Sequence, residues 1–357
     1  MRTILIVSTD NRAGKSLLSL GLGLTLRENG IPFSYMKPIS SKVSYSTGEP
    51  LDRDAGTIRD VLELDDPLKE IAPVALEGPF LQEAIESGDR GFHRRIVDAF
   101  ARITAGRDVA IVEGRRYLGL GTGAGLSDLD LAELLGADLL LLTSYDGEEA
   151  IDRILCALRM LEGGPNVLGV VINEVAMESQ FEQVRDVFVP FLADRGAEVL
   201  GIIPYERRLR WVQVDEIVER LGGKVLTDVP LELPVENFLV GAMGPEAALR
   251  SFRRTPNLGV ITGGDRHDLQ EAALTVPSLH CLVLTGNLRP PRRIIELANT
   301  RGVPIILVGQ HTMSAALLCQ ELPERSRLRR GARLDEAIEL VRKNVDLELI
   351  LEKAEDR

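Results

Sequence analysis

The sequence has few cysteines, few aromatic residues and no long apolar run. Only three cysteines occur, Cys156, Cys281 and Cys319, far apart, with no Cys-x-x-Cys pair and no histidine at ligand spacing. This spacing argues against a disulfide framework and a zinc site, and each cysteine is predicted to be a small core residue. Aromatic residues make up 4% of the chain, so we expect no stacking platform for nucleic-acid bases.

Charge and hydropathy narrow the class of protein further. The net charge of −12 disfavours a general nucleic-acid surface, and the basic run at residues 325–330 is expected to be a solvated loop or, less readily, an anion site. No apolar run reaches transmembrane length, and the first residues lack the order of a signal peptide. We therefore expect a cytoplasmic protein with no nucleic-acid or membrane partner. Its length of 357 residues allows two domains.

The first forty residues carry the clearest functional pattern. An apolar run at residues 3–7 is typical of a buried parallel strand, and a helical pattern extends from Lys15 to Gly30. The loop between them ends in Gly14-Lys15-Ser16. A strand, a tight loop and a helix form the context of a phosphate-binding loop, with Lys15 at the β- and γ-phosphates and Ser16 on Mg²⁺. The alternative is a chance Gly-Lys-Ser at the start of an ordinary helix, since the strict pattern requires Gly where this chain has Thr9.

Strands and helices alternate along the chain, which predicts an α/β fold of the P-loop NTPase type with a mostly parallel sheet and helices on both faces. Six strands are expected, near residues 3–7, 32–39, 109–114, 138–143, 167–175 and 198–204. A polar stretch rich in Gly and Pro at 205–235 predicts a domain boundary. Three more strands then predict a second, smaller α/β domain, at 258–264, 280–285 and 303–308. We predict domains over 1–210 and 211–325, and a helical tail over 326–357 whose charged helix belongs to the second domain.

Residues suited to phosphate chemistry lie where the expected strands end. Lys37 ends the second strand, Glu113 ends the third, Asn173 lies near the end of the fifth, and Asp54 follows the second closely enough to fold back. The carboxyl ends of parallel strands share one edge of a sheet, where open α/β folds bind ligands. With Ser16, these residues supply a hydroxyl, two carboxylates and a cation for phosphoryl transfer. ATP and Mg²⁺ are therefore the predicted cofactors.

The loop resembles the Gly-Thr-Asp-Thr-x-x-Gly-Lys-Ser/Thr loop of dethiobiotin synthetase and its ATP-dependent relatives. Five residues are in register with that loop: Thr9, Asp10, Gly14, Lys15 and Ser16. Ser8 takes the place of the first glycine of the family loop. The resemblance implies a nucleotide-binding loop made of Asp10, Asn11, Arg12, Ala13, Gly14, Lys15 and Ser16.

Further segments resemble the same family over about residues 1–205. Lys37-Pro38-Ile39 with Ser41 is similar to its Lys-Pro-Val-x-Ser segment, which implies a catalytic Lys37, acting with Lys15, and a Ser41 near the substrate. Asp54 and Glu113 resemble its two acidic magnesium positions, which implies a metal site with Ser16. The segments that end at 175 and 204 resemble those around the adenine base, which implies contacts from Asn173 and Pro204. The family follows Val-Glu-Gly with Ala-Gly-Gly, whereas this chain has Arg115-Arg116-Tyr117.

The second domain resembles a DRTGG-type domain, on the segments 240–243, 253–256, 260–266 and 281–286. A dethiobiotin synthetase-like domain followed by such a domain is similar to the N-terminal half of long bacterial phosphotransacetylases, where the pair is thought to regulate an acetyl-transferring domain. The resemblance therefore identifies a phosphotransacetylase-family protein. The chain ends at Arg357, and we expect no acetyl transfer from it.

Two segments have a structural as well as a functional interpretation. Asp128 and Asp130 are either metal ligands or, more simply, the acidic first turn of a helix capped by Ser127. Residues 262–266 join a strand to a helix, so their glycines either let backbone N–H groups bind an anion or accompany an Asp265 cap.

Two classes of function follow from the resemblance. The favoured one is a nucleotide-dependent regulatory or sensor protein, whose second domain binds an unknown small anionic ligand. The alternative is an ATP-dependent enzyme that activates a carboxylate, or a slow ATPase. A homo-oligomer is expected in either case.

Overall fold

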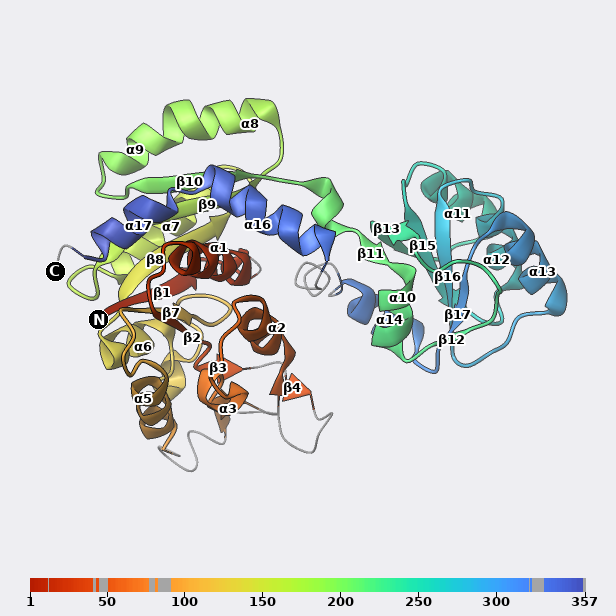
Figure 1. The fold of residues 1–357 in the computed structure, drawn as a ribbon. Helices are drawn as coiled ribbons and strands as arrows, with labels where there is room; N and C mark the ends of the chain where they lie inside the picture. Colours follow the sequence, from red (N-terminus) through yellow and green to blue (C-terminus); the bar gives the residue numbers. More distant parts are fainter. Residues whose placement is uncertain are drawn as a thin grey trace. The chain divides into compact units, whose positions relative to one another are not determined.

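The chain folds into two compact units, seen in a computed structural model that describes residues 1–11, 13–40, 43–44, 51–76, 81–82, 91–320, 322 and 331–355. Unit 1 comprises Met1–Glu206 with Leu328–Arg357, and unit 2 comprises Arg207–Arg327 (Figure 1). The chain therefore leaves unit 1, forms unit 2, and returns to complete unit 1.

A six-stranded parallel sheet forms the centre of unit 1. The strand order is β10 (Val199–Pro204), β9 (Val167–Val175), β8 (Asp138–Ser144), β1 (Arg2–Ser8), β7 (Val109–Glu113) and β2 (Phe33–Met36). All neighbouring pairs run parallel. The six predicted strands and the predicted α/β class are confirmed, because uninterrupted runs of Val, Ile and Leu form strands that are buried on both faces.

One face of this sheet is covered by α5 (Phe92–Ile103), α6 (Asp128–Leu135) and α7 (Glu149–Met160). Leu5 and Val7 of β1 pack into the core on that side. Since side chains alternate along a strand, Ile4 and Ile6 point to the opposite face, where both are fully buried.

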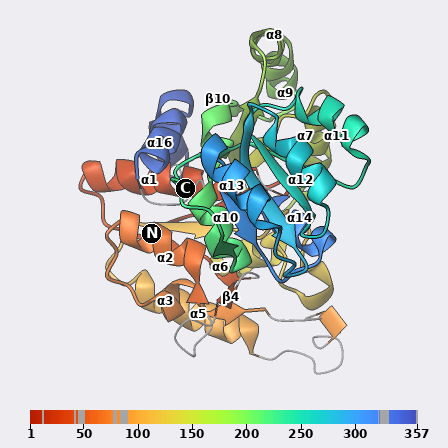
Figure 2. The same ribbon diagram turned by 90° about the vertical axis from the view of Figure 1, so that its right-hand side faces the viewer.

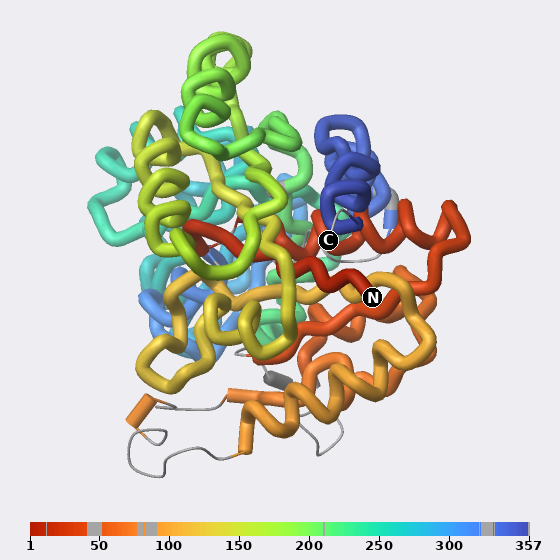
Figure 3. The backbone as a smooth tube through the Cα atoms, turned by 90° about the vertical axis from the view of Figure 1, so that its left-hand side faces the viewer, coloured from red at the N-terminus to blue at the C-terminus, as the bar shows by residue number. Residues whose placement is uncertain are grey.

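The opposite face holds α1 (Lys15–Glu28) together with α16 (Ala332–Asn344) and α17 (Leu347–Lys353) from the end of the chain (Figures 2 and 3). Arg342 donates a hydrogen bond to Glu28 at 3.0 Å, and the Asp346 N–H donates to the Leu200 carbonyl at 2.8 Å. The prediction that this charged helix belongs to the second domain is wrong. Its apolar stripe was visible in the sequence, but the surface that covers the stripe was not.

Shorter elements complete unit 1. Two small sheets pair β3 (Ile39–Ser40) with β6 (Val74–Ala75) and β4 (Val43–Ser44) with β5 (Leu51–Asp52). The remaining helical segments are α2 (Arg53–Val61), α3 (Leu68–Ile71), η1 (Thr122–Ala124), α8 (Glu178–Gln183), the π-helical η2 (Val184–Phe188) and α9 (Val189–Ala193).

Unit 2 contains a five-stranded sheet in the order β12 (Lys224–Val225), β17 (Ile305–Leu307), β16 (Leu279–Thr285), β15 (Leu258–Gly263) and β14 (Asn237–Val240), with only β12 antiparallel. Helices α10 (Val214–Leu221) and α14 (Thr312–Gln320) share one core cluster, and α11 (Pro245–Phe252), α12 (His267–Leu274) and α13 (Arg292–Arg301) share another. Its other elements are η3 (Arg207–Arg210), β11 (Val212–Gln213) and β13 (Pro234–Val235). The predicted second α/β domain is confirmed, although the short edge strands β12 and β14 were not among the predicted strands.

The cysteines and the hydropathy of the helices bear on two of the predictions. Cys281 and Cys319 are buried in the core of unit 2, as expected, but Cys156 is exposed on α7, so the prediction of a core position is wrong there. Within the described ranges, no helix has both the length and the apolar character needed to cross a membrane.

Candidate functional site

The phosphate-binding loop joins β1 to α1 at the carboxyl edge of the unit 1 sheet. Gly14 precedes the helix with φ of 101°, a left-handed conformation that favours glycine, and no side chain caps α1. A Cβ atom at this position would lie 2.6 Å from Nδ2 of Asn173. The first N–H groups of α1 are therefore uncapped by side chains, as anion binding at a helix start requires.

Asp10 fixes this loop to the neighbouring strand. Its carboxylate accepts hydrogen bonds from the Ser144 hydroxyl at 2.7 Å and from the Ser144 N–H at 2.9 Å. The Thr9 hydroxyl lies 2.7 Å from that of Thr143, and the Thr9 N–H donates to the Leu142 carbonyl. The Asp10 side chain thus stabilises the loop against the end of β8.

Ser8, which stands where the resembling family has glycine, connects the loop to Lys15. The residue lies in β1 and is fully buried, so its backbone stays extended. Its hydroxyl accepts a hydrogen bond from the Lys15 ammonium at 2.6 Å and lies 2.9 Å from the carbonyls of Asp10 and Arg116. Because the hydroxyl has one proton, it donates to one of these carbonyls at a time. Glycine cannot make these contacts.

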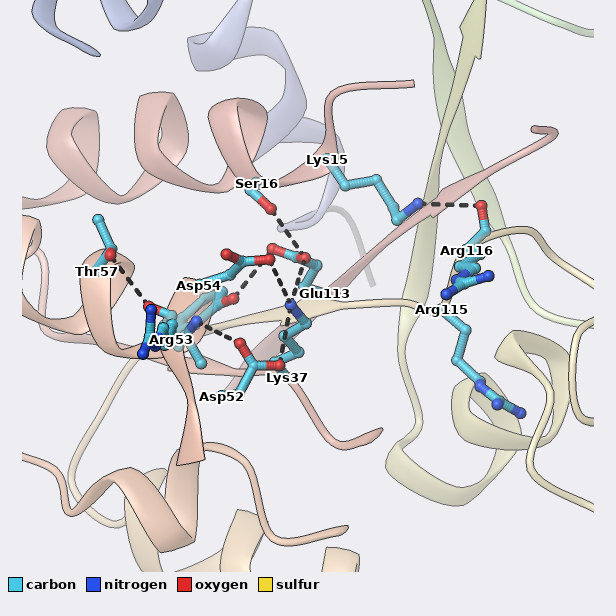
Figure 4. Close-up of polar contacts among 12 residues, drawn as sticks. Lys15, Ser16, Lys37, Asp52, Arg53, Asp54, Thr57, Glu113, Arg115 and Arg116 are labelled. Atoms are coloured by element: carbon cyan, nitrogen blue, oxygen red, sulfur yellow. Dashed lines mark hydrogen bonds and ion pairs between the residues drawn. The ribbon is translucent and has the colours of Figure 1, made fainter. Parts of the chain in front are cut away.

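Lys15 is held by neutral oxygen atoms. Besides Ser8, its ammonium contacts the Arg116 carbonyl at 3.4 Å (Figure 4). Burial lowers the pKa of Lys15, and nearby carboxylates, Asp128 first among them, offset this only in part. Among the described residues no carboxylate forms an ion pair with Lys15, so its charge is available to an anionic ligand.

Glu113, at the end of β7, contacts three side chains from other parts of unit 1. One carboxylate oxygen accepts a hydrogen bond from the Ser16 hydroxyl at 3.0 Å, and the other accepts one from the Tyr35 hydroxyl at 3.0 Å. The Lys37 ammonium lies 3.6 Å from the first oxygen. The structure therefore brings together three residues predicted for the site, Ser16, Lys37 and Glu113 (Figure 4).

Lys37 lies among three carboxylates. Its ammonium is 3.2 Å from Asp52, 3.6 Å from Glu113 and 3.9 Å from Asp54. Burial alone would lower the pKa of Lys37, but the carboxylates outweigh it and raise the pKa. Lys37 therefore stays charged at neutral pH.

Asp52 belongs to this cluster and was missed in the sequence. It is buried, and its carboxylate accepts the Ala55 N–H at 2.9 Å, which caps α2. Burial would raise the pKa of Asp52, yet Lys37 and the hydrogen bonds to the carboxylate lower it. An aspartate directly before a helical pattern is the signal of an N-cap, which predicts the cap but not the ion pair with Lys37.

The residues predicted near the adenine base lie at the same edge of the sheet. The Asn173 amide donates a hydrogen bond to the Ala13 carbonyl at 2.6 Å, and its oxygen accepts the Glu174 N–H at 2.8 Å. Pro204 ends β10, opposite Val175 of β9. Asn173 therefore supports the phosphate loop, and its predicted contact with a base remains a prediction, as does that of Pro204.

Two predicted residues, Arg12 and Ser41, lie outside the described residues. Asn11 is described and exposed, and Ala13 is buried. Their roles in nucleotide binding also remain predictions.

The oxygen atoms around Ser16 suit a magnesium ion. Carboxylate and hydroxyl oxygens are ligands that Mg²⁺ prefers, and it commonly takes one or two carboxylates together with phosphate oxygens and water. No group of three or more acidic, histidine or cysteine side chains in the described part of the chain forms a metal cage by itself. Ser16, Asp54 and Glu113 offer oxygens of these kinds, and their binding of a magnesium ion remains a prediction.

Asp128 lies beneath the loop that follows β7. Ser127 caps α6, with Asp130 completing the capping box, as the structural interpretation predicted. Asp128 instead is fully buried; one of its oxygens accepts the Arg115 N–H at 2.7 Å and the other has no hydrogen-bond partner. Burial raises the pKa of Asp128 to about 7, against the opposing effects of that N–H and of Lys15.

In unit 2, the glycines of residues 262–266 serve close packing. A Cβ atom on Gly264 would lie 1.9 Å from the Leu288 carbonyl oxygen, so only glycine fits there. The Gly264 N–H donates to Thr285, and the N–H groups of Arg266 and His267 bond within the loop. No side chain caps α12, so the suggested Asp265 cap is absent. Three N–H groups of this loop are thus already used, and an anionic ligand here remains a prediction.

Comparison with known families identifies both units. The model of a family described as an AAA domain matches residues 2–213. The chain belongs to this AAA domain family. A DRTGG domain model matches residues 216–322, which confirms the predicted order of a P-loop domain followed by a DRTGG domain. The assignment supports a nucleotide-binding protein.

Phosphate acetyltransferases and dethiobiotin synthetases are among the curated relatives of this AAA domain protein. Phosphate acetyltransferases of Nitrosomonas europaea and Pseudomonas putida are 28% and 27% identical over 338 and 333 residues, each covering 88% of this chain and 46% of the relative. The chain thus spans about half the length of these relatives. An ATP-dependent dethiobiotin synthetase of Methanococcus vannielii is 26% identical over 203 residues, covering 56% of this chain and 92% of the relative.

Solved structures resemble the chain only distantly. The cell division ATPase MinD of Pyrococcus furiosus aligns with a TM-score of 0.37 and 20% identity, covering 58% of this chain and 85% of MinD. The CBS and DRTGG domains of a Clostridium perfringens pyrophosphatase align with a TM-score of 0.28 and 18% identity, covering 40% and 69% of the two chains.

Proposed function

We propose that unit 1 binds Mg·ATP and that nucleotide binding regulates the relation between the two units. The observation that carries the nucleotide site is the convergence of Ser16, Glu113 and Lys37 beside the uncapped start of α1. In the proposed complex the N–H groups of α1 and Lys15 bind the phosphates. Ser16, Glu113 and Asp54 hold Mg²⁺, which neutralises phosphate charge when it is bound.

The regulatory part of the proposal is supported by the connections between the units. Unit 2 is joined to unit 1 at both ends, after β10 and before α16. Helix α16 packs on α1, the helix that follows the phosphate loop. A nucleotide that changes the position of α1 can therefore act on one of the two connections to unit 2.

The relatives are consistent with this proposal, because phosphate acetyltransferases align with 88% of this chain, over about half of their own length. In the proposal a small anionic ligand binds unit 2. Linkage then requires that a ligand which changes nucleotide affinity has its own affinity changed by the same factor.

A second candidate function is ATP-dependent activation of a carboxylate. It is favoured by Lys37, a charged ammonium beside Glu113 and Asp54, where it can stabilise the charge of a transferring phosphoryl group. In that case a carboxylate oxygen would attack the γ-phosphorus of ATP, the bond from that phosphorus to the oxygen that bridges it to the β-phosphorus would break, and ADP would leave. The Lys37→Ala change should then reduce turnover much more than nucleotide affinity.

One experiment separates the two functions. ADP release is measured with a panel of small carboxylates for wild type, Lys37→Ala and the control Lys69→Ala, which removes an exposed ammonium from α3. X-ray scattering with and without Mg·ATP follows the separation of the units. We expect slow ADP release with every carboxylate and a nucleotide-dependent change in scattering. Rapid, carboxylate-stimulated release that only Lys37→Ala abolishes, with unchanged scattering, would establish the enzyme instead.

A further inference from the structure

The loop that follows β7 presents an arginine beside the phosphate loop. The backbone of Arg116 is fixed there, because its carbonyl oxygen lies 2.9 Å from the Ser8 hydroxyl and 3.4 Å from the Lys15 ammonium. Two residues later, the Leu118 N–H donates to the Ser8 carbonyl at 2.9 Å. Arg116 therefore stays next to Lys15 whatever its side chain does.

The two adjacent arginines differ in what their side chains contact. The Arg115 guanidinium donates to the Leu120 carbonyl at 3.1 Å and runs away from Lys15 (Figure 4). Burial lowers the pKa of Arg115, and Asp128 opposes this. Arg116 is exposed, and among the described residues its guanidinium forms no hydrogen bond or ion pair. Arg115 thus stabilises the loop, while Arg116 offers a free cation.

The charge around the site makes a free cation significant. Five carboxylates surround the two lysines, and most of them already have partners. They belong to Asp10, Asp52, Asp54, Glu113 and Asp128. The Lys37 charge is shared among three of these. An oxyanion near the loop consequently meets carboxylate repulsion that Lys15 and the N–H groups at the start of α1 have to offset. A guanidinium presents several N–H donors in a planar fork that matches the oxygens of a phosphate or carboxylate.

We propose that Arg116 forms an oxyanion subsite next to Lys15. Its ligand is either the terminal phosphate of a nucleoside triphosphate or a separate oxyanion that binds beside a nucleoside diphosphate. The inference rests on the proposed nucleotide site. It adds to that site the residue that binds the group beyond the β-phosphate. It also explains a difference from the resembling family, which has glycine at the position of Arg116.

The test compares wild type, Arg116→Ala and Arg94→Ala by calorimetry with Mg·ATP, Mg·ADP, and inorganic phosphate added to the Mg·ADP form. Arg94 lies on α5 with 87% of its side chain exposed, so this control removes the same charge from a distant surface of the same unit. If the ligand is the terminal phosphate, Arg116→Ala weakens Mg·ATP binding by at least about tenfold and leaves Mg·ADP unchanged. If the ligand is a separate oxyanion, both nucleotides bind as before and phosphate binding is lost.

The outcomes against the proposal are distinct. If wild type binds nucleotide, and Arg116→Ala binds both nucleotides and phosphate equally well, the subsite is overturned but the proposed function is not. An equal loss of affinity for Mg·ATP and Mg·ADP also overturns the subsite, because Arg116 then supports the loop and binds no oxyanion. A wild type that binds neither nucleotide overturns the proposed function and the subsite together.

Discussion

Replacement of Asp128 by Asn tests the electrostatics beneath the phosphate loop. The carboxyl is fully buried, keeps one oxygen without a partner, and accepts a single N–H from Arg115. Asparagine retains the oxygen that accepts this bond and removes the charge. The variant therefore isolates the cost of ionising the buried group.

The sign and size of that cost follow from the raised pKa. Burial raises the pKa of Asp128 from 3.8 to about 7, so between these values the folded protein binds a proton that the unfolded chain has lost. Stability consequently falls as the pH rises through this window and levels off above it. At 1.36 kcal/mol for each pKa unit, the cost is about 2 kcal/mol at pH 5 and about 4 kcal/mol at pH 8.

Hydrogen exchange at pH 5 and pH 8 measures the difference. Exchange in β1 and β7 reports opening of unit 1, and comparison of variant and wild type at one pH cancels the intrinsic exchange rate. The stability of Asp128→Asn relative to wild type should increase by about 2 to 3 kcal/mol between the two pH values. The side-chain amide nitrogen that this substitution introduces would be buried without a hydrogen-bond partner. The free-energy cost of this is the same at pH 5 and pH 8, so it does not affect the increase.

A control removes a neighbouring charge. Asp130→Asn changes the capping carboxylate in the same turn of α6, which is only partly buried. If the difference between Asp128→Asn and wild type is equal at pH 5 and pH 8, Asp128 is ionised in the folded protein throughout. Lys15 and the start of α6 would then compensate fully for its burial, contrary to the reasoning above.

Three further predictions concern other parts of the molecule. Lys15→Ala should weaken Mg·ATP binding by at least about tenfold, or 1.4 kcal/mol, in calorimetry, because it removes the ammonium nearest the proposed phosphates, and equal affinities would contradict the site. Tight triphosphate binding should require Mg²⁺, and the Asp54→Asn, Glu113→Gln double variant should lose that requirement; a wild-type response to Mg²⁺ would make both residues structural. Gly264→Ala should lower the free energy of unfolding of unit 2 by about 1 to 3 kcal/mol in urea denaturation, since its Cβ would overlap the Leu288 carbonyl, whereas a change within about 0.5 kcal/mol would mean that the loop moves freely.

The parts of the site that could be predicted are those with a fixed place in a local pattern. Gly14, Lys15 and Ser16 follow an apolar strand and open a helix, Lys37 directly follows β2, and Glu113 ends β7. The sheet of unit 1 brings strand ends to one edge, so these residues meet without further information. Their convergence around Glu113 was therefore accessible from the sequence.

Other features depend on contacts between distant segments. The burial of Asp128 results from the loop that covers it, and a helix pattern gave only its place in the first turn. The position of α16 on α1 requires knowledge of which apolar surface is left uncovered. Asp52 was missed because a helix cap and an ion-pair partner of Lys37 look the same in sequence.

The return of the chain to unit 1 has a consequence for synthesis on the ribosome. Glu28 on α1 and Arg342 on α16 are 314 residues apart in sequence. At a synthesis rate of roughly 5 to 20 residues per second, α16 is made on the order of 15 to 60 seconds after α1, the helix that it covers. Unit 2 lies entirely between the two helices in sequence, so all of it emerges before unit 1 can be completed. During this interval the part of α1 that α16 covers is exposed, and synthesis that pauses after unit 2 prolongs this exposure.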